Sequence, residues 1–230
     1  SNKPPAEFPV EERNHTSPVP TLTANRSAWS ARHENYNDIS FDVLANEIVG
    51  IVGESGSGKS VTNLAVLGLL PQKSVDVSSG EILFEGADLL NYSTQELQEI
   101  RGNAISMIFQ EPMSSLNPSM RCGKQVTEIL QRHKKLSTQE AKTETLRLFE
   151  QVKLPRPESV FKAYPHEISG GQKQRVMIAM AIACKPKLLI ADEPTTALDV
   201  TVQKEIVLLL KELQKETGMS ILFISHDLSL

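Results

Sequence analysis

The chain has 230 residues, of which 40% are hydrophobic and 23% charged, and its formal net charge is -4. This composition is typical of a globular protein of one or two domains, and the acidic balance argues against a nucleic-acid partner. No apolar run approaches the ~20 residues of a membrane-spanning helix. The two cysteines, Cys122 and Cys184, suggest no disulfide framework, and Cys184 lies in an apolar run typical of a buried thiol.

The chain changes character near residue 36. Residues 1–35 are rich in Pro, Asn, Ser, Thr and charge and lack aliphatic periodicity, so we expect poor order there and no strand. Residues 39–43 alternate apolar and polar, which predicts a half-buried strand, and the apolar run 48–52 predicts a buried strand. The strands and helices expected beyond them are strands at 81–84, 105–109, 187–191 and 220–224, and helices at 62–70, 94–101, 169–184 and 200–216.

Residues 111–168 interrupt this alternation. Helical patterns occur at 122–134 and 138–152, and the second begins with the capping box Ser137 and Glu140. Strands that alternate with helices favour a parallel sheet. We therefore predict an α/β fold with a mostly parallel sheet and an inserted all-helical subdomain.

A phosphate-binding loop follows the strand at 48–52. The segment GESGSGKS matches G-x-x-x-x-G-K-[ST], with a strand before it and a helix after it. Its backbone N–H groups would surround phosphate oxygens, Lys59 would reach the β- and γ-phosphates, and Ser60 would bind Mg²⁺. The residues assigned to the nucleotide here are Gly53, Glu54, Ser55, Gly56, Ser57, Gly58, Lys59, Ser60 and Val61.

A second apolar strand ends in two carboxylates, Asp192 and Glu193. Buried parallel strands deliver their last residues to the carboxyl edge of the sheet, where ligands bind. Asp192 is the expected partner of Mg²⁺, and Glu193 is assigned to the attacking water as general base or positioning group.

Two further polar residues end apolar strands, Gln110 after 105–109 and His226 after 220–224. If these strands lie parallel, Lys59, Gln110, Asp192 and His226 converge on one edge. Gln110 would then contact Mg²⁺ or the water, and His226 the γ-phosphate and Glu193.

The segment HEISGGQKQRV, residues 166–176, starts a helix with two glycines, although glycine is a poor helix former. Ser169 is a good N-cap, and Gly170 and Gly171 would expose backbone amides at a positively charged helix end. A chain that already has one phosphate site rarely needs a second for the same phosphate. We therefore expect this helix start to bind the γ-phosphate held by another copy of the domain.

Together these motifs resemble the nucleotide-binding domain of an ABC transporter. The phosphate loop, Gln110, the segment ISGGQ, the acidic strand and His226 stand in that family's order, and Asp199 matches its D-loop. The resemblance implies a P-loop ATPase fold with an antiparallel β subdomain, and two domains that sandwich two ATP molecules with Mg²⁺. It also implies contacts in trans from Ser169, Gly171 and Gln172. Gly170 and Asp199 are assigned to the nucleotide as well. The implied core is 36–110 and 169–230, with helical subdomain 111–168.

Within that family, several segments of the sequence are similar to the ATPases of bacterial dipeptide, oligopeptide and nickel importers. The segments that carry this similarity are 110–118, 164–167 and 175–181. It implies an ATPase at the cytoplasmic face of the inner membrane that works with transmembrane permease subunits and, indirectly, with a substrate-binding protein. We expect the segment 113–118 near the contact with the permease.

The two ends of the chain depart from the family pattern. The residue that stacks on adenine is expected at Trp29, with Tyr36 as the second candidate. The chain ends four residues after His226, whereas family members continue with elements that finish the domain. We therefore expect exposed apolar surface on the strand at 220–224 and marginal stability.

Other interpretations stay open. The chain could be a soluble ABC-type ATPase without a membrane partner, or a truncated fragment that binds ATP without hydrolysing it. The sequence also leaves open the transported substrate, and whether the second domain is identical, different or on the same chain.

Overall fold

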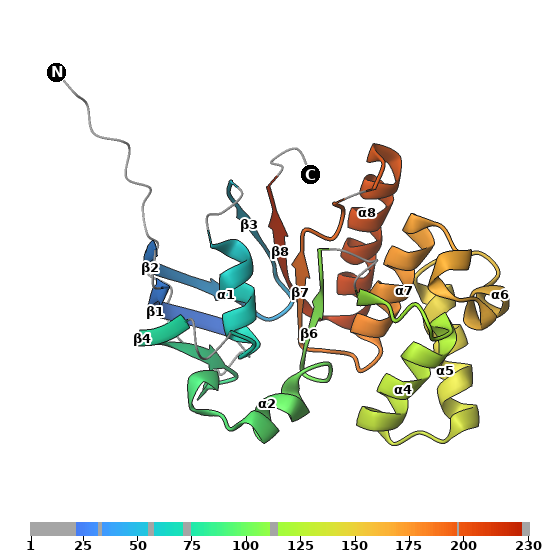
Figure 1. Cartoon of the computed structure of the whole chain (residues 1–230), viewed down its shortest axis with the longest axis horizontal. Coiled ribbons are helices and arrows are strands. Elements are labelled where there is room, and N and C mark those ends of the chain that lie inside the picture. Colours follow the sequence, from blue (N-terminus) through green and yellow to red (C-terminus); the bar gives the residue numbers. More distant parts are fainter. Residues whose placement is uncertain are drawn as a thin grey trace.

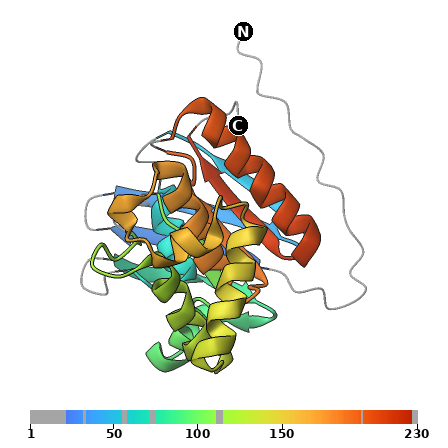
Figure 2. The same ribbon diagram turned by 90° about the vertical axis from the view of Figure 1, so that its right-hand side faces the viewer.

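The computed structural model places an antiparallel sheet on one side, a parallel sheet in the centre and a group of helices on the other side (Figure 1). Figure 2, viewed from the helical side, shows these helices in front of the strands. The structure describes residues 22–31, 34–54, 58–70, 75–110, 115–196 and 198–226.

The antiparallel sheet has the strand order β2 (Glu34–Val43), β1 (Leu22–Ala31), β4 (Val75–Phe84) and β5 (Ala87–Asp88). β1 pairs with both β2 and β4. The expectation that residues 1–35 are poorly ordered is therefore wrong for β1, while residues 1–21 lie outside the described part. The sequence of β1, LTANRSAWSA, has no aliphatic alternation, so its strand conformation depends on pairing along both edges.

The central sheet is parallel throughout, in the order β3 (Ile48–Val52), β8 (Ser220–Ser225), β7 (Leu188–Asp192) and β6 (Ile105–Ile108). The predicted α/β fold with a parallel core and an antiparallel sheet is confirmed. Because parallel strands end at the same edge of a sheet, the residues that follow these four strands gather there.

The parallel sheet separates two apolar clusters. Along β7, Leu188 and Ile190 pack with the cluster that faces the antiparallel sheet, whereas Leu189 and Ala191 pack with the cluster under the helices. Alternating residues of a strand point to opposite faces, so this central strand is apolar throughout and buried on both sides.

β3 lies at the edge of the sheet and pairs with β8. Ile48 is 40% exposed and Val52 44% exposed, so the expectation of a buried strand at 48–52 is wrong.

The expectation of exposed apolar surface on the strand at 220–224 is wrong as well. β8 lies between β3 and β7, and Ile221 and Ile224 are buried.

The helices of the sheet region begin and end near the predicted positions. They are α1 (Lys59–Val66), α2 (Thr94–Ile100), α7 (Gly170–Ile182) and α8 (Val200–Thr217), with a short 3-10 turn, η1 (Leu89–Asn91). α8 ends at Gly218, which adopts the left-handed conformation that terminates helices. Among the described residues, none of the helices has both the length and the apolar character that a membrane span requires.

In the described part of the segment between β6 and α7, all the regular elements are helices. It contains α4 (Cys122–Lys134), α5 (Thr138–Gln151), α6 (Pro157–Lys162) and the 3-10 turn η2 (Pro165–Glu167). Ser137 and Glu140 form the predicted capping box at α5.

Burial raises the pKa of the Cys122 thiol to about 11, so this cysteine is a neutral packing residue. Cys184 is also buried, as expected.

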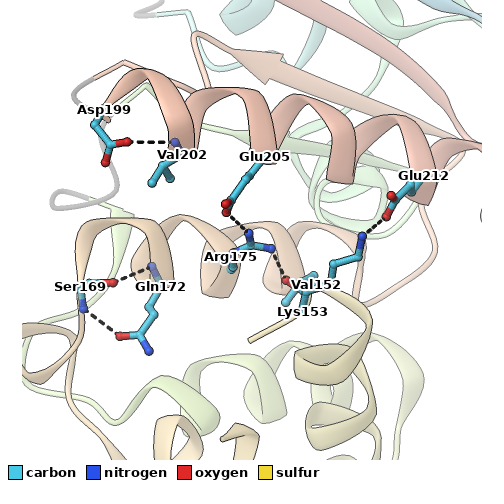
Figure 3. Close-up of polar contacts among 9 residues, drawn as sticks. All are labelled: Val152, Lys153, Ser169, Gln172, Arg175, Asp199, Val202, Glu205 and Glu212. Carbon is cyan, nitrogen blue, oxygen red and sulfur yellow. Dashed lines mark hydrogen bonds and ion pairs between the residues drawn. The ribbon is translucent and has the colours of Figure 1, made fainter. Parts of the chain in front are cut away.

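Polar contacts connect the end of α5 to α7 and α8 (Figure 3). Arg175 of α7 donates to the carbonyl oxygen of Val152 at 2.8 Å and to the carboxylate of Glu205 in α8 at 2.9 Å. Lys153 pairs with Glu212 further along α8. The guanidinium of Arg175 therefore lies where all three helices meet.

Gly123 allows α4 to approach α6 closely. A Cβ atom at this position would lie 2.2 Å from Cδ2 of Phe161, much closer than van der Waals contact allows. We expect Gly123→Ala to lower the free energy of unfolding by about 1–3 kcal/mol through overpacking. Urea denaturation measures this, with Gly50→Ala as control, because a Cβ there meets nothing within 4 Å. Equal stability of Gly123→Ala and the wild type would contradict the prediction.

Candidate functional site at the carboxyl edge of the parallel sheet

The phosphate loop lies between β3 and α1. Lys59 folds back over it, and its Nζ donates to the carbonyl oxygens of Gly53 at 2.6 Å and Glu54 at 2.7 Å. Residues 55–57 and the side chain of Ser60 lie outside what the structure describes. The ammonium group of Lys59 is thus held by residues 53 and 54, at the start of the loop sequence.

The start of α1 has no side-chain cap. Its N-cap is Gly58, with φ of 89°, a left-handed conformation that favours glycine. Among the described residues, no side chain caps this helix start. The first backbone N–H groups of a helix need acceptors, and the helix dipole makes this end positive. Phosphate oxygens are suitable acceptors.

Residues that follow β6, β7 and β8 meet at the carboxylate of Glu193. Nε2 of Gln110 donates to Oε2 of Glu193 at 2.7 Å, and Nδ1 of His226 lies 3.1 Å from the same oxygen. Gln110 is 83 residues from Glu193 in sequence, and His226 is 33 residues from it. Both contact Glu193 because the three strands are neighbours in parallel register. Of the four residues expected to converge at this edge, the structure brings Gln110 and His226 together, through Glu193. Asp192 immediately precedes Glu193, whereas Lys59 contacts the carbonyl oxygens of Gly53 and Glu54.

Asp192 is the last residue of β7 and is 5% exposed. A carboxylate at this depth requires compensation by a charge or by hydrogen bonds. Its position before Glu193, at the edge where α1 also begins, suits a divalent cation with oxygen ligands.

Thr196 joins the Glu193 cluster, and the sequence analysis did not assign it. Its Oγ1 donates to Oε2 of Glu193 at 3.0 Å, and its backbone N–H donates to the carbonyl oxygen of Glu193 at 3.1 Å. A proline at 194 favours a turn after Glu193, and that signal could have placed Thr196 beside it.

The start of α7 has a complete capping box. Oγ of Ser169 accepts from the N–H of Gln172 at 3.3 Å, and Oε1 of Gln172 accepts from the N–H of Ser169 at 2.9 Å (Figure 3). Ser169 and Gln172 therefore hold each other in place at the positive end of the helix.

Packing within the chain explains why residue 171 is a glycine. A Cβ atom there would lie 3.1 Å from Cγ1 of Val202 in α8, whereas one on Gly170 would have a single ordinary contact, 3.8 Å to Leu198. The glycine at 171 thus permits the close approach of α7 and α8, and the glycine at 170 is not needed for it.

Asp199 is the N-cap of α8. Its Oδ1 accepts from the backbone N–H of Val202 at 3.0 Å (Figure 3). The structure gives this residue a structural role besides the nucleotide contact expected from the sequence. Ala197, in the same loop, lies outside the described residues.

The comparison with family models covers most of this site. The model of the ABC transporter family matches residues 36–196. The chain belongs to the ABC transporter family.

This ABC chain is similar to transport ATP-binding proteins of known sequence. It is 54% identical over 210 residues to the oligopeptide transport ATP-binding protein OppD of Bacillus subtilis (strain 168), covering 91% of this chain and 59% of that one. To the dipeptide transport ATP-binding protein DppD of the same organism it is 51% identical over 210 residues, covering 91% and 63%. The chain thus spans about 60% of the length of these curated relatives.

A solved structure has the same fold. A dimeric ATP-binding cassette in a post-hydrolysis state, bound to ADP and Pi, superimposes with a TM-score of 0.77 at 28% identity. The match covers 91% of this ABC chain and 89% of that one.

The capping contact of Asp199 predicts a stability effect in this ABC chain. Asp199→Ala should lower the free energy of unfolding by about 1 kcal/mol, because the first turn of α8 loses its cap. Asp199→Ser should retain most of the stability, since serine is also a good N-cap. Chemical denaturation compares the three proteins. Equal losses in the alanine and serine variants would mean that the carboxylate acts in some way other than capping.

Proposed function

We propose that the chain is the ATP-hydrolysing subunit of a peptide importer. The observation that carries the proposal is the contact of Gln110 and His226 with the carboxylate of Glu193, at the edge where the phosphate-loop helix begins. Glu193 is the general base in this proposal. As the water oxygen bonds to the γ-phosphorus, Glu193 accepts the water proton, the bond from phosphorus to the bridging oxygen breaks, and ADP leaves with that electron pair.

The phosphate loop is proposed to hold the nucleotide. The first turn of α1, which follows the N-cap Gly58, would supply N–H donors. Lys59, which now donates to loop carbonyls, would turn to the β- and γ-phosphates. Mg²⁺ would be held by Ser60, Asp192 and Gln110, and would neutralise charge that develops on the phosphate oxygens.

The start of α7 is proposed to bind the γ-phosphate on a second copy of the domain. Figure 1 shows α1 and α7 on opposite sides of the parallel sheet. This separation supports a partner domain, identical or not, rather than two contacts with one nucleotide. The similar cassette that binds ADP and Pi is dimeric. Ser169, Gly170, Gly171 and Gln172 are the residues proposed for this contact.

Permease subunits are the proposed membrane partners. Ser115, in the segment 113–118, lines an apolar groove between β6 and helices α4 and α7, together with Met107, Phe109, Ile129, Met177 and Met180. Residues 113 and 114 lie outside the described part. Methionine-rich apolar surfaces suit a protein partner. The names of the similar proteins, oligopeptide and dipeptide transport ATP-binding proteins, support peptide as the substrate, delivered through a substrate-binding protein at the other face of the inner membrane.

Glu193→Gln tests hydrolysis and dimer formation together. We expect this variant to bind ATP, to lose at least about 100-fold in kcat, and to double its mass with ATP and Mg²⁺ in light scattering. Ser169→Arg in the same background should prevent the doubling, because its side chain would fill the phosphate contact.

The two measurements separate the parts of the proposal. Undiminished hydrolysis by Glu193→Gln would refute the general-base assignment. A doubling that survives Ser169→Arg would refute the assignment of the α7 start to the nucleotide of a partner.

Adenine stacking can be followed through Trp29, the only tryptophan of the sequence. Trp29 in β1 and Tyr36 in β2 are register partners, so the two candidates lie opposite each other in the antiparallel sheet. Their side chains lie outside the described part. We expect ATP to quench the tryptophan fluorescence, and Trp29→Leu to weaken ATP binding by roughly tenfold, as stacking is worth about 1–3 kcal/mol. Loss of affinity in Tyr36→Leu instead would assign stacking to Tyr36.

A further inference from the structure

All the described polar contacts of the Glu193 carboxylate fall on one of its two oxygens. Gln110, His226 and Thr196 approach Oε2, at 2.7, 3.1 and 3.0 Å. The first two come from the ends of β6 and β8, whereas Thr196 belongs to the turn that Glu193 itself begins. Among the described residues, this arrangement leaves Oε1 without a polar contact.

The backbone of Glu193 has an unusual conformation. Its φ is 44°, in the left-handed region, which non-glycine residues seldom adopt unless the surrounding structure holds them there. Its N–H donates to the carbonyl oxygen of Ile224 in β8 at 3.0 Å, and its carbonyl oxygen accepts from the N–H of Thr196 at 3.1 Å. Thr196 therefore contacts both the main chain and the side chain of Glu193.

The three donors differ in their freedom to move. The side chain of His226 is 56% exposed, and Gln110 is exposed as well. Both are assigned contacts with Mg²⁺, water or phosphate, which would draw them from Glu193 when nucleotide binds. Thr196 has no such competing assignment, and its hydroxyl lies in the same turn as the carboxylate.

We propose that Thr196 is a positioning residue that fixes the Glu193 carboxylate, so that Oε1 faces the attacking water while Oε2 is held by the threonine hydroxyl. This inference rests on the proposed ATPase function and adds a residue to it. A general base must be held in hydrogen-bond reach of the proton that it accepts, and small misplacements cost rate. Thr196 acts on the reaction through Glu193 and not on the nucleotide.

The test is Thr196→Val, which keeps the shape of the side chain and removes the hydroxyl. We expect kcat for ATP hydrolysis to fall by about 10- to 100-fold, with KM and the Kd for ATP within about twofold. Thr196→Ser should restore kcat to within about threefold, because it returns the hydroxyl. With ATP and Mg²⁺, Thr196→Val should accumulate the doubled mass that the wild type loses on hydrolysis.

Controls distinguish this role from a structural one. Thr143→Val removes a threonine hydroxyl that donates to the carbonyl oxygen of Gln139 on the exposed face of α5, and should leave kcat unchanged. Thr196→Ala is the second variant, and denaturant midpoints show that each protein is folded. Loss of kcat that serine does not restore, or an increase in KM without loss of kcat, would overturn the positioning role.

The Glu193→Gln protein, assayed beside these variants, separates the two proposals. If Glu193→Gln is inactive while Thr196→Val retains the wild-type kcat, the ATPase function stands and the role of Thr196 is refuted. If Glu193→Gln hydrolyses ATP as fast as the wild type, the proposed general base fails, and with it the role of Thr196.

Discussion

The parallel register of β6, β7 and β8 is the constraint on which the site depends. Ile108 pairs with Ala191, and Asp192 pairs with Ile224, so the three strands end at one level. The N–H of Glu193 then continues the ladder by donating to Ile224, one residue beyond the end of β7. A slip of one residue in β7 would exchange its two faces and move Glu193 away from both of its neighbours. The alternation of Leu188 and Leu189 between two apolar clusters opposes such a slip.

The helical segment 115–168 shares an apolar cluster with the sheet and with α7 and α8. The sequence suggested a separate subdomain at 111–168, because its composition and periodicity differ from those of the flanking strands. The cluster under the helices nevertheless runs without interruption from Phe149 in α5 through Ile178 in α7 to Ile206 in α8. The exposed pair of Lys153 and Glu212 adds little to this packing, since surface ion pairs contribute about 0–1 kcal/mol. Arg175 differs, because its side chain is only 12% exposed and meets two acceptors.

Sequence analysis could reach the site because its residues sit in patterns whose chemistry is local. A strand followed by a glycine-rich loop and a helix predicts a phosphate site without further information. Polar residues that follow apolar strands are predicted to lie at one edge of the sheet, provided that the strands are parallel. The remaining features depend on contacts between distant segments. β1 has no periodic pattern and becomes a strand because β2 and β4 pair with it. β3 has the apolar sequence of a central strand, yet its position at the edge follows from strand order, which no local pattern encodes.

The two glycines at the start of α7 have different explanations. Gly171 faces Val202 closely enough that any side chain would press on the first turn of α8, which Asp199 caps. That constraint needs no ligand. Gly170 is exposed, and a Cβ atom on it would meet a single side-chain atom at an ordinary distance of 3.8 Å. Packing within this chain therefore accounts for glycine at 171 and not at 170. A bare backbone at 170, beside the capped and positive end of a helix, fits the approach of an anion from outside the chain. Since α1 and α7 lie on opposite sides of the sheet (Figure 1), that anion would, under the proposed function, be the γ-phosphate on a partner domain.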